Sequence, residues 1–257
     1  MRHGLPESVD RKLERRFDPV GRYGIRLTLL GAAVVLVGIP FGMLLEQVLR
    51  SGPLTRVDTG VARTLNDHIG SIPGGAGTLQ VISFLGKPIW LGLIVGAVVV
   101  WALIRRRLRV AVFLVVTCLG GGLVDSLVKQ AVGRSRPVVD HPVAHAFGKS
   151  FPSGHSMSST ICYGALVLVF LPLLGPVARR VAIGAAAALV LAIGIARMAL
   201  GLHFLSDVLG GYVLGAAWLM ASVAAFEMYR DDLGLRPTAP VTEGVEPEQA
   251  RELVGAS

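Results

Sequence analysis

The sequence predicts an all-α protein, a bundle of six transmembrane helices with both termini in the cytoplasm. Of the 257 residues, 53% are hydrophobic and only 16% are charged, whereas about a quarter of the residues of a soluble domain are charged. Apolar runs long enough to cross the roughly 30 Å hydrocarbon core of a bilayer recur along the chain. The basic residues gather in alternate connections between these runs.

Six apolar runs have the length of a membrane span, although the second is short. The alternative, a soluble protein with buried helices, does not call for runs of this length. Glycine clusters such as LGGG and GGYVLG lie inside the runs, where small residues let helices approach closely in lipid. The expected spans are residues 27–47, 88–104, 109–131, 156–176, 181–201 and 204–226.

The distribution of positive charge predicts the orientation. Sixteen of the 25 Lys and Arg residues occur in segments that an even number of spans places on one side, and such segments are cytoplasmic by the positive-inside rule. A basic surface against anionic lipid headgroups accounts for the net charge of +8, so no nucleic-acid partner is expected. Four basic residues in the first external loop run against this pattern. The cytoplasmic segments are residues 1–26, 105–109 and 179–180, and the tail after residue 229.

We expect one membrane domain, residues 25–228, between two cytoplasmic tails. The basic tail 1–24 precedes an apolar run without a small-residue cleavage site, so that run is expected to remain as an anchor. The tail 229–257 is polar, acidic and contains proline, which predicts disorder. Cys118 and Cys162 fall inside spans and are expected to be free thiols rather than a disulfide.

The first external loop contains LTRVDTGVARTLNDHI, in which apolar residues recur at helical spacing. This pattern predicts an amphipathic helix. Two placements stay open, one on the outer membrane surface and one packed over the helix bundle. The apolar set is Leu54, Val57, Val61, Leu65 and Ile69.

Three polar groups interrupt the apolar sequence near the ends of spans, and charges in such places indicate function because they are costly in a membrane. The groups are KQAVGRSRP (129–137), KSFPSGHS (149–156) and ARMALGLHFLSD (196–207). The first ends the third span, the second begins the fourth, and the third joins the fifth to the sixth. With both termini inside, all three groups lie at the outer face, where we expect them to converge.

The residues in these groups are of the kinds that bind phosphate. Lys129, Arg136 and Arg197 bring three positive charges, and a guanidinium fork matches an oxyanion. Ser153 and Gly154 lie where a helix should begin, so free backbone N–H groups favour an anion there. Gly154 also lets the backbone come close. No Asp/Glu cluster is available for a divalent cation, so the site is expected to need no metal and no cofactor.

Two histidines are candidates for catalysis. His203 and Asp207 are four residues apart, so the carboxylate can hold one ring nitrogen and leave the other free to attack. His155 is then available as the acid for the leaving group. This arrangement suits covalent catalysis through a phosphohistidine. Any one of these side chains has an ordinary structural explanation, such as an arginine that snorkels to the interface, but the set as a whole does not.

The three groups resemble the signature of the type 2 phosphatidic acid phosphatase (PAP2) superfamily, which reads K-x6-R-P, P-S-G-H and S-R-x5-H-x3-D. The resemblance covers about residues 50–226. It implies that His203 is the nucleophile and His155 the general acid/base, and that the basic residues, with the motif serine and glycine, bind phosphate. The matching stretches are Lys129-x6-Arg136-Pro137, Pro152-Ser153-Gly154-His155 and Arg197-x5-His203-x3-Asp207.

Three further positions need separate interpretation. Ala196 stands where the family has serine, which removes a hydroxyl that could touch phosphate or orient the arginine. Asp125 lies one helical turn before Lys129, where it can pair with the lysine or neutralise it within the membrane. His141 and His145 have the spacing of metal ligands but no third ligand, so no metal is expected there.

The resemblance implies a metal-independent phosphatase that acts on lipid phosphates from the extracytoplasmic face of the cell membrane. The partners expected are therefore the lipid substrate and membrane lipids, and the sequence does not indicate an oligomeric state. Undecaprenyl diphosphate is the expected substrate, because the site faces the side on which that carrier is released. Phosphatidylglycerophosphate and phosphatidic acid are the alternatives.

Two other functions compete with hydrolysis. A lipid phosphotransferase would use the same site with an alcohol in place of water, and the sequence does not separate it from a phosphatase. A channel or transporter would carry charges along the middle of its spans, whereas these charges are concentrated at the outer ends.

Overall fold

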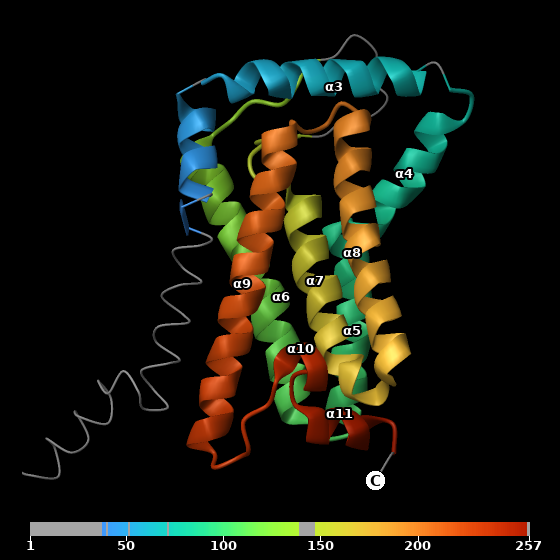
Figure 1. Ribbon diagram of the computed structural model, residues 1–257, viewed down its shortest axis with the longest axis vertical. Coiled ribbons are helices and arrows are strands. Elements are labelled where there is room, and N and C mark those ends of the chain that lie inside the picture. Colours follow the sequence, from blue (N-terminus) through green and yellow to red (C-terminus); the bar gives the residue numbers. More distant parts are fainter. Residues whose placement is uncertain (1–37, 40, 51, 71, 139–146, 256–257) are drawn as a thin grey trace, which may run out of the picture.

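The computed structural model describes residues 38–39, 41–50, 52–70, 72–138 and 147–255, and every regular element within them is a helix. Figure 1 shows an upright bundle with helix α3 lying across one end. The N-terminal tail, most of the first expected span and the pair His141 and His145 lie outside the described residues.

Four of the described helices are long and apolar enough to cross a membrane, or five if the pair α4 and α5, bent by 41°, counts as one span. The four coincide with the third to sixth expected spans. Helix α5 coincides with the second, and α4 is an addition that the sequence did not predict. The bounds are α4 Gly75–Leu85, α5 Pro88–Ile104, α6 Leu108–Val132, α7 Gly154–Phe170 with the turn η1 Leu171–Leu173, α8 Pro176–Ala199 and α9 Leu205–Asp232.

Proline and glycine mark several helix ends. Pro88 and Pro176 occupy the first turns of α5 and α8, where the missing N–H has no intrahelical partner to lose. Gly133 ends α6 with φ of +66°, a left-handed conformation that glycine adopts without a Cβ clash. The chain therefore leaves the membrane directly before the loop that carries Arg134 and Arg136.

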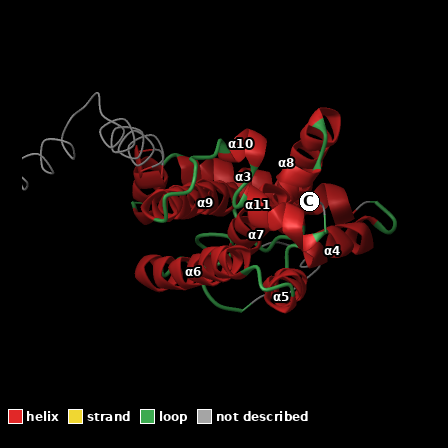
Figure 2. Ribbon diagram, turned by 90° about the horizontal axis from the view of Figure 1, so that it is seen from below, coloured by secondary structure: helices red, strands yellow, loops and turns green. Residues whose placement is uncertain are grey.

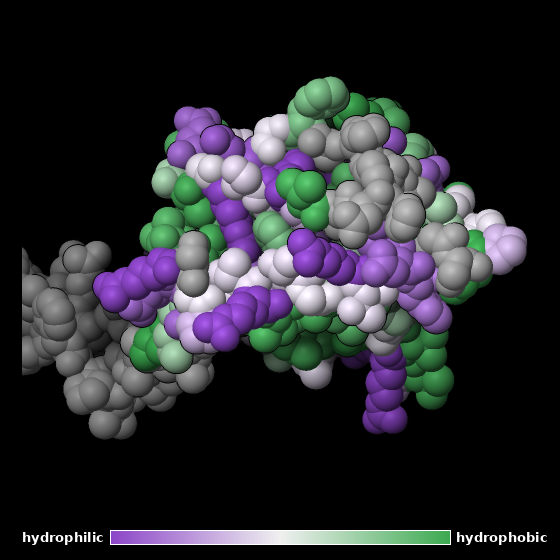
Figure 3. All heavy atoms as spheres, turned by 90° about the horizontal axis from the view of Figure 1, so that it is seen from above, coloured by the Kyte–Doolittle hydropathy of each residue, from purple (hydrophilic) through white to green (hydrophobic). Residues whose placement is uncertain are grey.

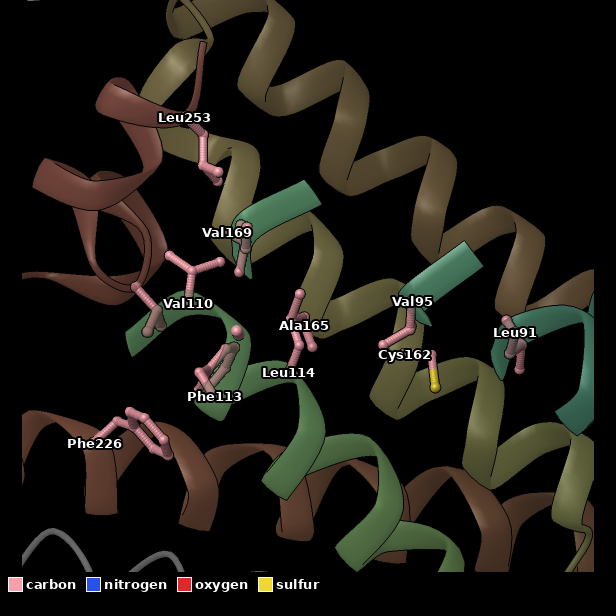
Figure 4. Close-up of a cluster of buried hydrophobic side chains, with 13 residues drawn as sticks. Leu91, Val95, Val110, Phe113, Leu114, Cys162, Ala165, Val169, Phe226 and Leu253 are labelled. Atoms are coloured by element: carbon pink, nitrogen blue, oxygen red, sulfur yellow. The ribbon is translucent and has the colours of Figure 1, made fainter. Parts of the chain in front are cut away.

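Helix α7 is the centre of the bundle and packs against α5, α6, α8 and α9 (Figure 2). The buried apolar cluster in Figure 4 joins α5, α6, α7 and α9 with the C-terminal tail, and Phe113 of α6 meets Phe226 of α9 edge to face at 5.1 Å. Cys162 lies in this cluster and, like Cys118, is a free thiol. Large apolar side chains such as Leu119 and Val181 are exposed on the outside of the bundle, as expected of a surface that faces lipid.

The C-terminal tail is folded, so the prediction of disorder for residues 229–257 is wrong for the part that the structure describes. Helices α10 (Pro240–Glu243) and α11 (Pro247–Leu253) pack against the end of α7 and η1, at the opposite end of the bundle from α3 (Figure 1). Val245, Ala250 and Leu253 are fully buried.

Ion pairs explain why an acidic tail folds here. Arg230 of α9 is fully buried and donates to Glu246 at 2.9 Å and to Glu248 at 3.0 Å. Arg109 of α6 donates to the same Glu246 carboxylate at 2.6 Å. The side chain of Gln249 accepts the backbone N–H of Arg109 at 3.0 Å, at the start of α6 where N–H groups lack helical partners. The acids of the tail therefore have cationic partners that composition alone does not reveal.

Helix α3 (Leu54–Gly70) packs over the ends of α8 and α9, which is one of the two placements left open. Its buried stripe is Asp58, Ala62 and Asn66, while Val57 of the apolar set is half exposed. The stripe is polar because the ends of two helices offer polar partners: Asn66 donates to the carbonyl of Ala199 at 3.3 Å. Hydrophilic residues also gather on the outward face of this end (Figure 3).

Candidate active site

The three motif groups meet at the end of the bundle that α3 crosses (Figure 1). A guanidinium nitrogen (Nη1) of Arg136, after α6, lies 3.1 Å from Nε2 of His203, between α8 and α9. The backbone N–H of Ser153, before α7, donates to the carbonyl of Asp207 at 2.9 Å. The predicted convergence of the three groups is thus present in the structure.

His203 is held between a carboxylate and a guanidinium. Its Nδ1 lies 3.4 Å from Oδ2 of Asp207, and its Nε2 faces Arg136. A guanidinium can only donate hydrogen bonds, so Nε2 is the unprotonated nitrogen and Nδ1 carries the proton toward the carboxylate. This tautomer presents a lone pair on Nε2, on the ring edge away from Asp207.

Burial keeps this imidazole neutral. The side chain of His203 is 2% exposed, and burial lowers its pKa to about 4, although the Asp207 carboxylate raises it in part. Burial also lowers the pKa of Arg136, which Asp207 partly offsets, and a guanidinium stays charged at neutral pH even so. A neutral imidazole beside a cation is suited to attack an anionic substrate.

The N-terminus of α7 also lines the site. Ser153 is its N-cap and is fully buried, and the first N–H groups of a helix have no intrahelical partners. A Cβ on Gly154 would lie 3.1 Å from Nζ of Lys129, so the glycine leaves the space in front of the ammonium open. Lys129 is paired with Asp125, which is the pairing considered from the sequence.

His155 and Arg197 supply polar atoms without partners. Arg197 is 7% exposed and donates from Nη1 to the hydroxyl of Ser83 at 3.1 Å. Its Nε and the Nε2 of His155 are buried and have no hydrogen-bond partner within the described part of the chain. Buried polar atoms are normally paired, so these two atoms are available to the polar groups of a ligand.

Helix α4 and its junction with α5 contribute to the site although no motif predicted it. A Cβ on Gly86, between the two helices, would lie 3.5 Å from the His155 ring, and Ser83 of α4 binds Arg197. Ala196, which replaces the family serine, is fully buried.

Sequence reasoning also missed the residues that surround Asp207. Arg134 donates to the Asp207 carboxylate at 2.6 Å and to Asp58 of α3 at 2.8 Å. The hydroxyl of Ser150 donates to Asp207 as well. Arg134 and Ser150 lie inside two of the quoted motif stretches, so their positions were a usable signal, whereas nothing in the sequence links Asp58 to this site.

Comparison with known proteins agrees with the motifs. Residues 109–231 match the model of the PAP2 superfamily. Phosphatidylglycerophosphatase B of Bacillus subtilis (strain 168) is 40% identical over 96 residues, which are 36% of this chain and 46% of that protein. Lipid A 1-phosphatase of Rhizobium johnstonii is 31% identical over 126 residues, 46% of this chain and 48% of that protein. The matched region thus spans about half the length of these curated relatives.

A solved structure shares the fold. The crystal structure of the first transmembrane PAP2 type phosphatidylglycerolphosphate phosphatase from Bacillus subtilis superposes with a TM-score of 0.67 at 22% sequence identity. The superposition covers 80% of this chain and 98% of that chain. Together with the three motifs and their convergence, these matches lead to one conclusion: residues 109–231 of this chain are similar to the PAP2 superfamily, and the chain shares the fold of a PAP2 type phosphatase.

Proposed function

We propose that this protein is a membrane phosphatase that hydrolyses the phosphate headgroup of a lipid through a phosphohistidine. The observation that carries the proposal is the setting of His203, with Asp207 at Nδ1 and Arg136 at Nε2. This setting gives a nucleophile of defined tautomer next to a cation that can bind the phosphoryl oxygens. The names of the relatives, a phosphatidylglycerophosphatase and a lipid A phosphatase, support the same reaction class.

The reaction has two steps. In the first, Nε2 of His203 attacks phosphorus, the bond from phosphorus to the leaving oxygen breaks, and His155 gives that oxygen a proton. In the second, His155 takes a proton from water, the water oxygen attacks phosphorus, and the phosphorus–nitrogen bond breaks. Phosphate leaves and both histidines return to their first state. Lys129, Arg136 and Arg197 neutralise the phosphoryl oxygens, and the first N–H groups of α7, at Ser153 and Gly154, donate to them.

The substrate that the relatives favour is phosphatidylglycerophosphate rather than the undecaprenyl diphosphate expected from the sequence. Undecaprenyl diphosphate stays as the second candidate, because a site at the outer ends of the spans can reach a carrier that is released there. A phosphotransferase would differ only in the acceptor. Phosphate release is measured in detergent with phosphatidylglycerophosphate, phosphatidic acid and undecaprenyl diphosphate, which distinguishes the candidate substrates. Analysis of the products formed in the presence of glycerol distinguishes a phosphatase from a phosphotransferase.

Phosphate release is expected to survive EDTA and to be inhibited by vanadate. The acids nearest the site already pair with cations, Asp125 with Lys129 and Asp207 with Arg134, and vanadate resembles the five-coordinate phosphorus of the transition state. Purified protein is assayed with each lipid before and after chelation, with His203→Ala as the blank. Activity that is lost to EDTA and restored by magnesium contradicts metal-independent hydrolysis.

The site is expected to face the outside of the cell. In a variant without Cys118 and Cys162, cysteine at Val138, beside the site, should react with an impermeant maleimide in intact cells. Cysteine at Val241, in the tail, should react only after permeabilisation. The two positions are matched controls, because their side chains are 90% and 73% exposed. The reverse labelling pattern would place the site in the cytoplasm.

A further inference from the structure

We propose that Arg134 and Asp58 form a positioning pair that fixes Asp207, and through it the aim of the His203 ring, without touching the phosphate. The inference deepens the proposed function and rests on it. It concerns two residues on a loop and on α3 that lie on the side of the ring away from Nε2.

Arg134 is fixed by several contacts at once. Its Nη1 donates to Oδ1 of Asp207 at 2.6 Å and to the hydroxyl of Ser206 at 2.7 Å, and its Nη2 donates to Oδ2 of Asp58 at 2.8 Å. The guanidinium carbon also lies 4.3 Å from the ring centre of Phe204. Asp58 and Asp207 are 1% and 0% exposed, so these are charge-assisted bonds inside the protein, where such bonds are strong.

These contacts determine how Asp207 meets His203. Oδ1 of the carboxylate is bound by Arg134. Oδ2 accepts the backbone N–H of Phe204 at 2.9 Å and the hydroxyl of Ser150, and it is this oxygen that lies 3.4 Å from Nδ1 of His203. With both oxygens held, the carboxylate cannot rotate freely, so the imidazole N–H has one direction in which to point.

The two arginines of this loop have different places although they are only two residues apart. Arg136 meets His203 at Nε2, the nitrogen that attacks. Arg134 binds the carboxylate that faces Nδ1, on the opposite edge of the ring. A phosphate in line with Nε2 therefore meets Arg136 and not Arg134, which makes Arg134 a positioning residue.

Asp58 completes the pair from a separate helix. Its Oδ1 accepts the backbone N–H of Ser206 at 2.9 Å, in the first turn of α9, where N–H groups lack helical partners. The N-cap residue of α9 is Phe204, whose side chain has no acceptor, so Asp58 caps α9 in its place. Helix α3 thus holds both the start of α9 and the guanidinium of Arg134.

Because Arg134 and Asp58 are charged, substituting them should shift the pKa of His203 in opposite directions. A loss of packing alone would not produce opposite shifts. Loss of the Arg134 charge leaves Asp207 less neutralised, which stabilises protonated His203 and raises the pKa of its imidazole. Without the Asp58 charge, the positive charge of Arg134 is no longer partly neutralised. This charge then disfavours protonated His203 more strongly and lowers the pKa of its imidazole. The other charged or titratable groups that act on the ring stay unchanged in both variants; they are Asp207 on α9, Arg136 on the loop, Arg197 on α8 and His155 on α7.

The test compares Arg134→Gln, Arg134→Lys and Asp58→Asn, with Arg56→Gln on the exposed face of α3 as the control. Arg134→Gln is expected to lower kcat about 10- to 100-fold, as a small misplacement of a reacting group does, with KM within about threefold of wild type. The acid limb of kcat/KM, which reports the free enzyme, should move to higher pH. Asp58→Asn should move it to lower pH. Arg134→Lys should leave the limb in place and still lower kcat, because an ammonium lacks the fork.

A second measurement needs no substrate. Spectra of protein labelled with 15N-histidine, assigned with a His203→Asn variant, report the tautomer and titration of His203 directly. Opposite shifts in Arg134→Gln and Asp58→Asn support the pair even if wild-type protein releases no phosphate, a result that would contradict the proposed function alone. Wild-type kcat in Arg134→Gln, or an unmoved His203 titration in both variants, overturns the inference. If Arg134→Gln does not fold, Asp58→Asn and Arg134→Lys decide the question by the same two measurements.

Discussion

His203→Ala is expected to abolish phosphate release and to leave no phosphoenzyme. No other described nucleophile has a carboxylate at one ring nitrogen and a cation at the other, so nothing else at the site can carry the phosphoryl group. The measurement is rapid acid-free quenching with radiolabelled lipid phosphate, followed by detection of an acid-labile phosphoprotein. A phosphoenzyme trapped on the His203→Ala protein would refute this assignment.

His155→Ala is the matched variant and should behave differently. Loss of a general acid/base costs about two to four decades in rate, and both steps should slow. A substrate with a leaving group that needs no proton should be affected less in its first step, so this variant should still form the phosphoenzyme. Equal loss with both kinds of leaving group would mean that His155 binds phosphate rather than moving a proton.

Arg230→Met is expected to destabilise the fold by about 3–5 kcal/mol, the usual cost of removing one partner from a buried ion pair, with Arg109 left as the remaining cationic partner of Glu246. Arg230 is fully buried between Glu246 and Glu248, and Glu246 is itself fully buried. Reversible unfolding in mixed detergent measures the free energy of unfolding. The double variant Arg230→Met with Glu246→Leu should recover much of the loss, because an apolar pair can replace a buried ion pair.

The control for this prediction is Arg236→Met in the same tail. Arg236 pairs with Glu243 at 3.2 Å, but both side chains are exposed by more than a third, and surface pairs contribute about 0–1 kcal/mol. Similar destabilisation by Arg236→Met and Arg230→Met would show that the buried network does not hold the tail. Similar stability of Arg230→Met and wild type would show the same.

The second to sixth expected spans, which lie in the described part of the chain, and the meeting of the motifs could be predicted because a membrane imposes both. The length of an apolar run determines which segments can cross the membrane. Consecutive spans run in opposite directions, so every second connection lies at the same end of the bundle. Chemistry then singled out His203 and Arg136, whose contact at 3.1 Å the structure provides.

Partners far apart in sequence could not be predicted. Arg134 and Arg136 have the same chemistry in the sequence. The structure shows that Arg134 binds the carboxylate at Nδ1 of His203, whereas Arg136 lies at Nε2. In the sequence, the acidic residue Glu246 indicates a solvent-exposed tail. In the structure, Arg109 of α6, which is distant in sequence, donates to the Glu246 carboxylate. For α3, helical spacing of apolar residues predicted the helix but not the burial of Asp58 and Asn66, which find their partners on other helices.

The position of Asp58 and Ser83 has a practical consequence for anyone who wants a smaller version of this protein. The stretch that matches the family model begins at residue 109, so a gene fragment cut at that boundary would encode both histidines yet omit Asp58, which binds Arg134, and Ser83, which binds Arg197. Transplanting that stretch into another scaffold would carry the reactive groups without their supports. A minimal unit for engineering therefore has to begin before α3, at or ahead of Leu54.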